Sequence, residues 1–512
     1  MITTKTAFRA ALIAGASLLA TAGAASAQTV SPDNAAARIA ALEAQLEALQ
    51  KQVSDLKAAT AASVKDVRAA QSATTVSLAN ARPTFSTGDG AFSASIRGIF
   101  QADAALYDQK SAGPLSTDFR RGSFGDATEN DRARDLSDGA NVRRARLGIE
   151  GKAFGVFDYN MIYDFGGSGT EEAGKISSAW VQYSGLPLKI RAGVYAPVTS
   201  LEDAANNTGS LFVERASVAE TVRGVAGGDG RAAIGVLGNG ERWNVSAAVT
   251  GNTVTTQTFD EQLGFVGRFA YVPLKGDGWL VHTGVNANLV ISPAKSGPDV
   301  AATGGATSNL RLRDRPELRV DGTRLIDTGN IDADGLTAIG LELGAQRNNV
   351  FVQAEYFDIQ VKRRNSTLPD PKFNGWYVQA GWTLTGEPRR YSTATAGFDA
   401  PRPAKPFDLK KGNWGAVELA ARYSTFDLDY LAGPAGSAPV TGAIRGGEQN
   451  ILSLGVNWYL NPVVSLSAAY RNVEVKRLSP GGTAFVAGST PVAGAQVGQD
   501  LDIWSVRTQY AF

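Results

Sequence analysis

From residue 92 onward, apolar and polar residues alternate along the chain with a period of two. In "AFSASIRGIFQADAALY" (91–107), the even positions carry apolar side chains, and serine, arginine, glutamine and aspartate stand at odd positions. The same rhythm returns in "GWYVQAGWTLTG" (375–386) and "ILSLGVNWYL" (451–460). Because successive side chains of a β-strand point to opposite faces, the pattern predicts strands with one apolar and one polar face.

About sixteen such segments follow one another, each about 8–14 residues long, which is the length of an outer-membrane strand. They begin near residues 92, 140, 156, 178, 187, 231, 242, 264, 279, 336, 350, 375, 415, 449, 463 and 501. Tight turns alternate with long polar loops, which cover 108–138, 199–230, 251–263, 291–335, 361–374, 427–447 and 477–500. Short turns on one side and long loops on the other are typical of transmembrane barrels. One connection, 387–413, is long where a tight turn is expected.

Two soluble folds compete with a barrel, the β-helix and the large sandwich. A β-helix repeats at a fixed interval, and the sequence has no such interval. A sandwich allows the same alternation, but the tryptophans favour a barrel, since they lie near strand ends as an interfacial girdle requires. They are Trp180, Trp243, Trp279, Trp376, Trp382, Trp414, Trp458 and Trp504. The predicted fold is all-β, a 16-stranded antiparallel transmembrane β-barrel preceded by a short N-terminal coiled-coil helix.

The first residues have the pattern of a secretory signal peptide. Lys5 and Arg9 precede a small, apolar stretch over 10–24, and "ASA" at 25–27 fits a cleavage site. The alternative, a membrane anchor, needs about 20 apolar residues, which is more than this stretch provides. The predicted organisation is a signal peptide (1–27), a periplasmic helical segment (28–70), a linker (71–90) and an outer-membrane barrel (91–512).

The segment 35–70 differs from the rest, because its apolar residues are spaced by three and four. The seam consists of Ile39, Leu42, Leu46, Leu49, Val53 and Leu56. This spacing predicts a helix whose apolar seam packs as in a coiled coil. Self-association is favoured over docking on a partner surface, because the sequence predicts no second helix to pack against. The seam residues favour two strands by peptide rules, so the seam alone does not indicate a trimer.

Composition excludes several classes of function. The chain has no cysteine and one histidine, so thiolate and histidine metal sites are not expected, and we expect no cofactor. A formal net charge of +1 argues against a nucleic-acid binder. A hydrolase needs a histidine beside a nucleophile, and nothing in the sequence around His282 marks one. We therefore predict a protein without enzymatic activity.

Four stretches resemble the phosphate-selective porin O and P family. They are "VRRARLGIEGKAFGVFDYNMIYDFGG" (142–167), "AWVQYSGLPLKIRAGVYAPVTSLEDAANNTGSLFVERA" (179–216), "GWYVQAGWTLTGEPRRY" (375–391) and "GVNWYLNPVVSLSAAYRNVEVKR" (455–477). The resemblance implies a trimer of sixteen-stranded barrels, a third loop that constricts the lumen, and passive uptake of anions such as phosphate. It also implies that the barrel assembly machinery recognises Phe512. In our strand count, the loop 199–230 after the fifth strand matches the constriction loop.

If the apolar face of each strand meets lipid, the polar face lines the lumen, and its charges decide which ions pass. An arginine-rich wall favours anions, because the planar fork of arginine binds two oxygens at once. The candidate pore-lining and anion-selectivity residues are Arg97, Arg144, Arg146, Lys189, Arg191, Arg215, Arg223, Arg268, Arg422 and Arg471.

The same residues have a plainer explanation, since inward arginines that pair with inward acids brace a wall without selecting solutes. Asp103, Glu150, Glu342, Glu355 and Glu418 also fall on inward positions, and the loop 199–230 carries both signs. The predicted function is an outer-membrane porin of a Gram-negative bacterium for small hydrophilic solutes, biased towards anions. A general non-selective porin and a structural or tethering envelope barrel are the alternatives. The expected partners are further copies of the chain as a homotrimer, outer-membrane lipid, the barrel assembly machinery and small anions, but no nucleic acid.

Overall fold

The computed structural model describes residues 32–109, 136–167, 174–254, 259–297, 306–481, 493–494, 496–498 and 500–512. The chain divides into two units, of which the first ends at Ala73 and the second covers Thr74–Phe512. The predicted signal peptide lies outside the described residues, as do most of the loop predicted over 108–138 and part of the loop predicted over 477–500.

The first unit contains the helix α2 (Pro32–Ser72), which confirms the predicted helix. Proline suits the first helical position, because the amide there has no acceptor within the helix. The seam residues from Ile39 to Leu56 are each more than half exposed, so this chain alone does not bury the seam. The coiled coil therefore stays a prediction. Among the described residues, no helix is both long and apolar enough to cross a membrane.

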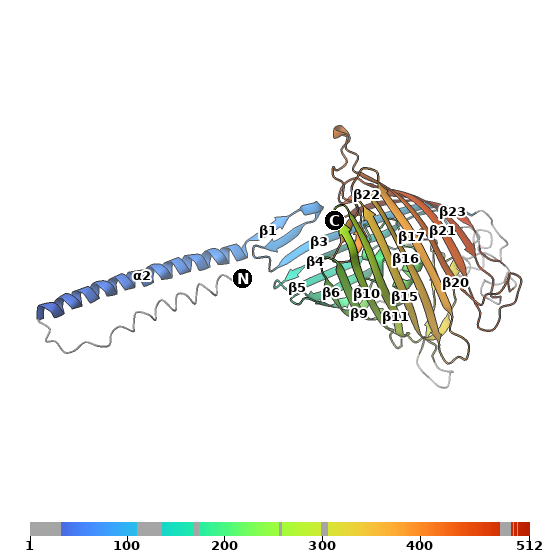
Figure 1. Cartoon of the computed structure of the whole chain (residues 1–512), viewed down its shortest axis with the longest axis horizontal. Coiled ribbons are helices and arrows are strands. Elements are labelled where there is room, and N and C mark those ends of the chain that lie inside the picture. Colours follow the sequence, from blue (N-terminus) through green and yellow to red (C-terminus); the bar gives the residue numbers. More distant parts are fainter. Residues whose placement is uncertain are drawn as a thin grey trace. The chain divides into compact units, whose positions relative to one another are not determined.

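The second unit contains sixteen antiparallel strands, counted over the described residues, that form a closed barrel (Figure 1). They are β3 (Ser93–Gln109), β4 (Gly139–Ala153), β5 (Phe157–Asp164), β6 (Lys175–Tyr183), β7 (Lys189–Val194), β8 (Arg231–Asn239), β9 (Trp243–Thr253), β10 (Leu263–Gly276), β11 (Trp279–Ser292), β15 (Ile331–Arg347), β16 (Val350–Arg363), β17 (Lys372–Thr383), β20 (Ala416–Tyr430), β21 (Ile444–Tyr459), β22 (Val464–Lys476) and β23 (Leu501–Ala511). Each strand pairs with the next, and β23 pairs with β3, so the barrel has no free edge. The predicted 16-stranded barrel is confirmed.

The closure of the barrel depends on a close approach between Phe512 and Gly98. The Phe512 amide donates to the Gly98 carbonyl at 2.9 Å, and the Gly98 amide donates to the Phe512 carbonyl at 3.1 Å. A Cβ atom on residue 98 would lie 2.5 Å from the Phe512 ring, so glycine lets the ring pack against the first strand.

The segment expected as a linker, 71–90, contains two strands, β1 (Thr74–Ser77) and β2 (Thr84–Thr87). They pair with each other, and β2 pairs with the start of β3, where Thr84 faces Ser95. β23 reaches only to Ile99 along β3, so β2 covers the edge that β23 leaves open. Threonine, valine and phenylalanine in these short runs favour a strand.

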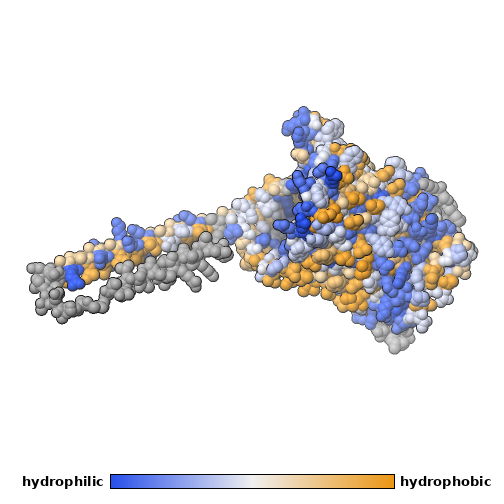
Figure 2. All heavy atoms as spheres, viewed as in Figure 1, coloured by the Kyte–Doolittle hydropathy of each residue, from blue (hydrophilic) through white to orange (hydrophobic). Residues whose placement is uncertain are grey.

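Hydrophobic side chains gather over the outside of the barrel wall (Figure 2). Six tryptophans, at positions 243, 279, 376, 382, 414 and 504, are each at least 39 % exposed, as a girdle requires. Trp180 is an exception to the expected girdle. It lies opposite Asn160 on the inward face of β6. The guanidinium of Arg191 stacks on its ring, with the guanidinium carbon 4.0 Å from the ring centroid.

The height of the wall varies around the barrel. β5, β6, β7 and β8 have 8, 9, 6 and 9 residues, whereas β20, β21, β22 and β23 have 15, 16, 13 and 11. A strand needs about 9–11 residues to cross the hydrocarbon core. The wall is therefore low along β5–β8 and tall along β20–β23.

Candidate functional site in the lumen

Three segments among the described residues fold from the rims of the barrel into its interior. We call residues 195–230, between β7 and β8, the inner loop. Residues 306–330, before β15, are the outer segment, and residues 384–415, between β17 and β20, are the periplasmic segment. They determine which wall residues face open space and which face protein.

The inner loop contains α4 (Leu201–Ala204) and α5 (Ser217–Ala226). Val218, Ala219, Val222 and Ala226 are buried, and their spacing places them on one side of α5. α5 contacts β10, β11, β17 and β20, and β20 lies eight strands from β7, on the opposite side of the barrel. The loop that the resemblance matched to the constriction therefore does cross the lumen.

Glu355, on β16, anchors the start of the inner loop. Its carboxylate accepts hydrogen bonds from the amides of Leu201 (2.8 Å) and Glu202 (3.0 Å), and from the hydroxyl of Tyr377 (2.6 Å). Because three donors from the loop and from β17 meet on this one carboxyl group, the contact fixes α4 against the wall.

Arg422, on β20, anchors the middle of the inner loop. It forms ion pairs with Glu202 of the loop and, at 3.0 Å, with Glu317 of the outer segment. It also donates to the Glu214 carbonyl at 3.0 Å, and its guanidinium stacks on Phe212 at 4.7 Å. One wall arginine thus holds two inward segments together.

Charged residues of the inner loop pair mostly with one another. Asp203 accepts from Arg223 at 2.6 Å and lies 2.9 Å from Arg215, which also pairs with Glu220 at 3.0 Å. Burial alone would raise the pKa of Asp203, but Arg223 and Arg215 hold it below its usual value. Arg215 and Arg223 are therefore bound to carboxylates and hold the loop in shape.

Glu214 joins the inner loop to the opposite wall. It accepts from Arg143 of β4 at 2.6 and 3.2 Å and from Arg507 of β23 at 3.2 Å. Burial would raise its pKa, but Arg143, Arg144, Arg319 and Arg507 hold the pKa of this carboxyl well below its usual value. Glu214 therefore stays ionised.

The outer segment contains the short strands β12 (Asn309–Leu310), β13 (Arg313–Asp314) and β14 (Ile326–Asp327). Between it and α5 lies a pocket of about 370 Å³. Its charged lining residues are Glu220, Arg311, Arg313, Asp314, Arg315, Arg319 and Arg324. This basic pocket lies at the end of the barrel that bears the long loops.

Asp314 makes the charge of this pocket depend on pH. Burial raises its pKa to about 7, against the opposing effect of Arg319. Proton uptake below pH 7 removes a negative charge, so anion permeability should rise as the pH falls from about 8 to about 6. The Asp314→Asn variant should keep, at every pH in this range, the higher anion permeability that the wild type shows at acidic pH. Reversal potentials in planar bilayers measure this permeability. An unchanged pH profile in that variant would contradict the assignment.

The periplasmic segment contains a hairpin of β18 (Arg390–Ser392) and β19 (Gly397–Asp399) that lies against the lumen wall. Arg389 is buried and forms a bidentate pair with Glu418 of β20 at 2.7 and 2.8 Å. Arg268 of β10 donates to the carbonyls of Thr395 (2.6 Å) and Ala396 (2.8 Å) at the hairpin tip. Wall groups on both sides therefore hold the hairpin.

The hairpin also contacts the inner loop. Asp399 accepts from the amide of Asn206 at 3.0 Å, and Arg389 donates to the carbonyl of Gly209 at 2.8 Å. Phe398 is buried and packs on Phe351 of β16 with ring centroids 4.8 Å apart. The periplasmic segment therefore closes against the constriction from the periplasmic side.

His282 belongs to this same cluster. Its Nε2 lies 3.1 Å from Glu342, and its Nδ1 lies 2.8 Å from the hydroxyl of Tyr391 in the hairpin. Glu342 also accepts from Arg268 and Asn286. The two ring nitrogens are thus occupied by a wall carboxylate and the hairpin, and neither faces an aliphatic hydroxyl among the described residues.

A family model for phosphate-selective porin O and P matches residues 116–512. The chain belongs to this family. It is an outer-membrane porin of a Gram-negative bacterium, and porins of this kind are channels without catalysis.

Two relatives and two solved structures are similar to this porin. Porin O of Pseudomonas aeruginosa is 26 % identical over 403 residues, 77 % of this chain and 85 % of the relative. An uncharacterised protein of Caulobacter vibrioides is 28 % identical over 459 residues, 82 % and 83 % of the two chains. An anion-selective porin from Comamonas acidovorans has a TM-score of 0.44 at 14 % identity, and the channel DcaP of Acinetobacter baumannii has 0.43 at 12 %. The alignment with the Comamonas porin covers 82 % of this chain and 100 % of that porin, and the alignment with DcaP covers 84 % of this chain and 99 % of DcaP.

In this porin, six of the ten predicted arginine and lysine positions are ion-paired. Arg97 pairs with Glu150 at 3.2 Å, and Arg146 with Asp164 at 2.7 Å and Asp229 at 2.5 Å. The other paired residues are Arg215, Arg223, Arg268 and Arg422. For these six, bracing accounts for the contacts.

The remaining four residues form no ion pair among the described part of the chain. Arg191 bonds to Gln182 and stacks on Trp180. Arg144 donates to Gln101 at 2.7 Å, and its Nε has no acceptor among the described residues. Arg471 donates to Ser505 at 2.8 Å. Lys189 is half-buried at the start of β7.

Sequence reasoning missed three contributors to the lumen. Strict alternation with Arg144 and Arg146 inward would place Arg143 on the outer face, but a bulge after Gln101 turns it inward beside Arg144. Arg389 and Glu317 lie in connections whose position a strand pattern does not specify. The unusual length of the connection 387–413 was the only signal for the former.

Proposed function

We propose that this porin passes small anions, with Arg471 as a binding point on their path. Arg471 lies on β22 and is fully buried within the lumen. Its Nη1 is bonded to Ser505, whereas its Nε and Nη2 have no acceptor among the described residues. A guanidinium with two unpartnered donor nitrogens and no carboxylate partner among the described residues is the observation that carries the proposal.

The energetics of burial support an anion at this point. A buried donor without a partner costs about 1–3 kcal/mol, and more when it is charged, so such groups are normally met by water or an ion. Ser453 lies directly opposite Arg471 on β21, and its hydroxyl also has no partner among the described residues. Arg422 lies opposite Ser453 on the other side. A tetrahedral oxyanion can accept hydrogen bonds from Arg471 and Ser453 together.

Phosphate should block chloride current through the wild-type porin in planar bilayers, and Arg471→Gln should weaken this block. We expect the apparent dissociation constant to rise about tenfold, since one charge-assisted hydrogen bond contributes roughly 1.5–3 kcal/mol. Chloride conductance itself should persist, because the barrel stays intact.

Lys410→Gln is the control, since Lys410 is an exposed cation in the periplasmic segment. It removes the same charge away from the lumen wall and should leave the block unchanged. Equal phosphate block in the wild-type porin and in Arg471→Gln would refute the binding point.

A general, non-selective porin is the second candidate. It is favoured by the pairing of most lumen arginines with carboxylates, which cancels their charge at long range. A reversal potential near zero under a salt gradient, together with no phosphate block, would select it.

We infer that the porin functions as a homotrimer. Two features support association, the exposed seam of α2 and the low wall along β5–β8. A six-residue strand is too short to shield its rim from lipid, so another protomer on this side would complete the apolar surface. Recognition of Phe512 by the barrel assembly machinery stays a prediction.

A further inference from the structure

The outer wall carries a cation at the periplasmic rim, where the lipid headgroups lie. Arg347 ends the outward row of β15, after Leu341, Leu343 and Ala345, and it is exposed. No side-chain hydrogen bond or ion pair engages it among the described residues. It lies opposite Trp279 on one side and Val350 on the other, and Val350 lies opposite Trp382. Two girdle tryptophans therefore mark its level as the membrane interface.

Arg347 lines a groove of about 590 Å³ together with Trp279, Val281, Val350 and Asp277. Asp277 lies in the tight turn between β10 and β11, and it is exposed and forms no ion pair among the described residues. The groove thus carries a cation and an anion among mainly apolar lining residues.

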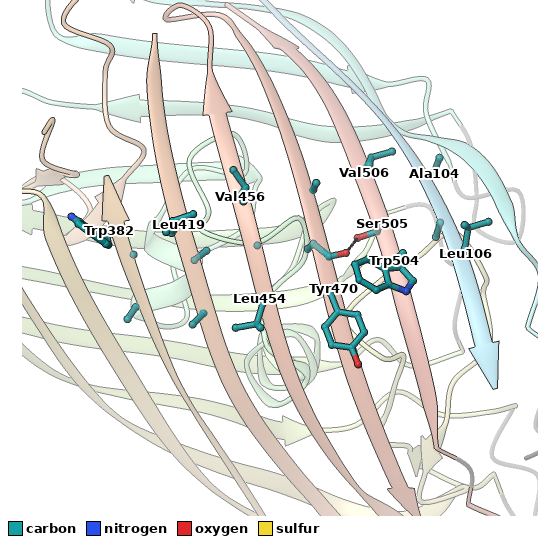
Figure 3. A pocket seen from close by; sticks show the side chains of 18 of the residues that line it. Ala104, Leu106, Trp382, Leu419, Leu454, Val456, Tyr470, Trp504, Ser505 and Val506 are labelled. Carbon is teal, nitrogen blue, oxygen red and sulfur yellow. Dashed lines mark hydrogen bonds between the residues drawn. The ribbon is translucent and has the colours of Figure 1, made fainter. Parts of the chain in front are cut away.

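A second, larger groove of about 1060 Å³ adjoins the first at Val350 (Figure 3). It crosses β17, β20, β21, β22, β23 and β3, and its larger lining side chains include Trp382, Leu419, Tyr470, Trp504 and Leu106. The hollow exists because the outward residues Ala380, Ala421 and Ala468 are small.

The register shows that the two grooves form one rising path. Starting at Val350, which pairs with Arg347, each outward residue lies directly opposite the next one on the neighbouring strand. The series runs through Trp382, Leu419, Val456, Ala468, Val506 and Ala104. Trp382 is next to the periplasmic end of its strand, whereas Ala104 lies far along β3 towards the other end. The path therefore climbs from the headgroup level into the hydrocarbon core, as the tilt of barrel strands requires.

We propose that this groove binds a phospholipid of the periplasmic leaflet with an amino headgroup, of the phosphatidylethanolamine class. The phosphate binds Arg347, whose fork suits two phosphate oxygens. The ammonium binds Asp277, and the acyl chains follow the alanine-floored groove. Charge complementarity favours this lipid, because Arg347 and Asp277, of opposite sign, line the same groove.

A second copy of the chain is the competing occupant, and the height of the wall argues against it. Most of the groove lies on β20–β23, where strands of 11–16 residues are long enough to span the hydrocarbon core of the membrane by themselves. The side that needs a protein neighbour is β5–β8.

The test measures lipid retained by the full-length porin in detergent, by native mass spectrometry with added phosphatidylethanolamine or phosphatidylglycerol. Arg347→Gln should weaken the binding of both lipids about tenfold, since both carry the phosphate. Asp277→Asn should weaken phosphatidylethanolamine alone, and it keeps the turn, because Asn-Gly suits a two-residue hairpin as well as Asp-Gly. Ala421→Trp should weaken both by filling the groove.

Lys362→Gln is the matched control, because Lys362 is an exposed cation on the neighbouring strand β16, at the opposite rim. It should leave retention unchanged. Wild-type retention in Arg347→Gln would overturn the proposal. So would an Ala421→Trp variant that loses oligomers while keeping its lipid, since that result assigns the groove to a second copy.

Discussion

Replacing residues 386–415 with an Asn-Gly turn should increase the single-channel conductance of this porin about twofold or more. The replacement removes the hairpin of β18 and β19, which lies between β10 and β20 and closes against the inner loop. Leu384 already pairs with Val417 across the connection, so a tight turn can join the two strands there. Arg268 would keep its ion pair with Glu342, and Glu418, which loses Arg389, would face water that solvates its carboxylate.

Single-channel recording in planar bilayers measures this effect. Lys410→Gln, in the exposed part of the same segment, should keep the wild-type conductance. A shortened porin that folds, as judged by heat-modifiable migration, but conducts like the wild type would show that the ion path avoids the hairpin.

Arg422→Gln should destabilise the lumen by about 3–5 kcal/mol, because it leaves the buried carboxylates of Glu202 and Glu317 without their cation. The inner loop and the outer segment are both held by this guanidinium, so both should loosen. We expect faster proteolysis of the inner loop and a lower urea midpoint in detergent.

The double variant Arg422→Gln with Glu317→Gln separates charge from packing. Removing one of the two carboxylates should restore a measurable part of the lost stability, as a coupled pair requires. Strictly additive losses would show that Arg422 acts through packing on Phe212 instead.

The barrel could be predicted from the sequence because its two solvents differ. Lipid outside and water inside impose alternation on every strand, so each predicted strand start lies within five residues of an observed one. The alternation of inward and outward residues breaks where a bulge changes the local backbone geometry. The bulge beside Gln101 adds a residue, so Arg143 and Arg144 both point inward although they are neighbours.

The contents of the lumen could be predicted only in part. Inward arginines such as Arg422 followed from alternation, but their partners lie far away in the chain. Arg422 pairs with Glu202, 220 residues distant, and Arg389 donates to Gly209 over 180 residues. No local pattern encodes which loop enters the barrel, so bracing and selective arginines looked alike. Only the residues around each guanidinium distinguish Arg268, which is paired with Glu342, from Arg471, which has unpartnered nitrogens.

The pairing of β23 with β3 constrains how the polypeptide is made and delivered. Arg507 meets Asp103 across 404 positions, so the contacts that complete the wall are among the most distant in sequence. Topologies of such high contact order form slowly. Until the last strand arrives, the growing sheet presents two unsatisfied borders that would recruit other chains. Export therefore demands that newly made chains be kept apart until insertion.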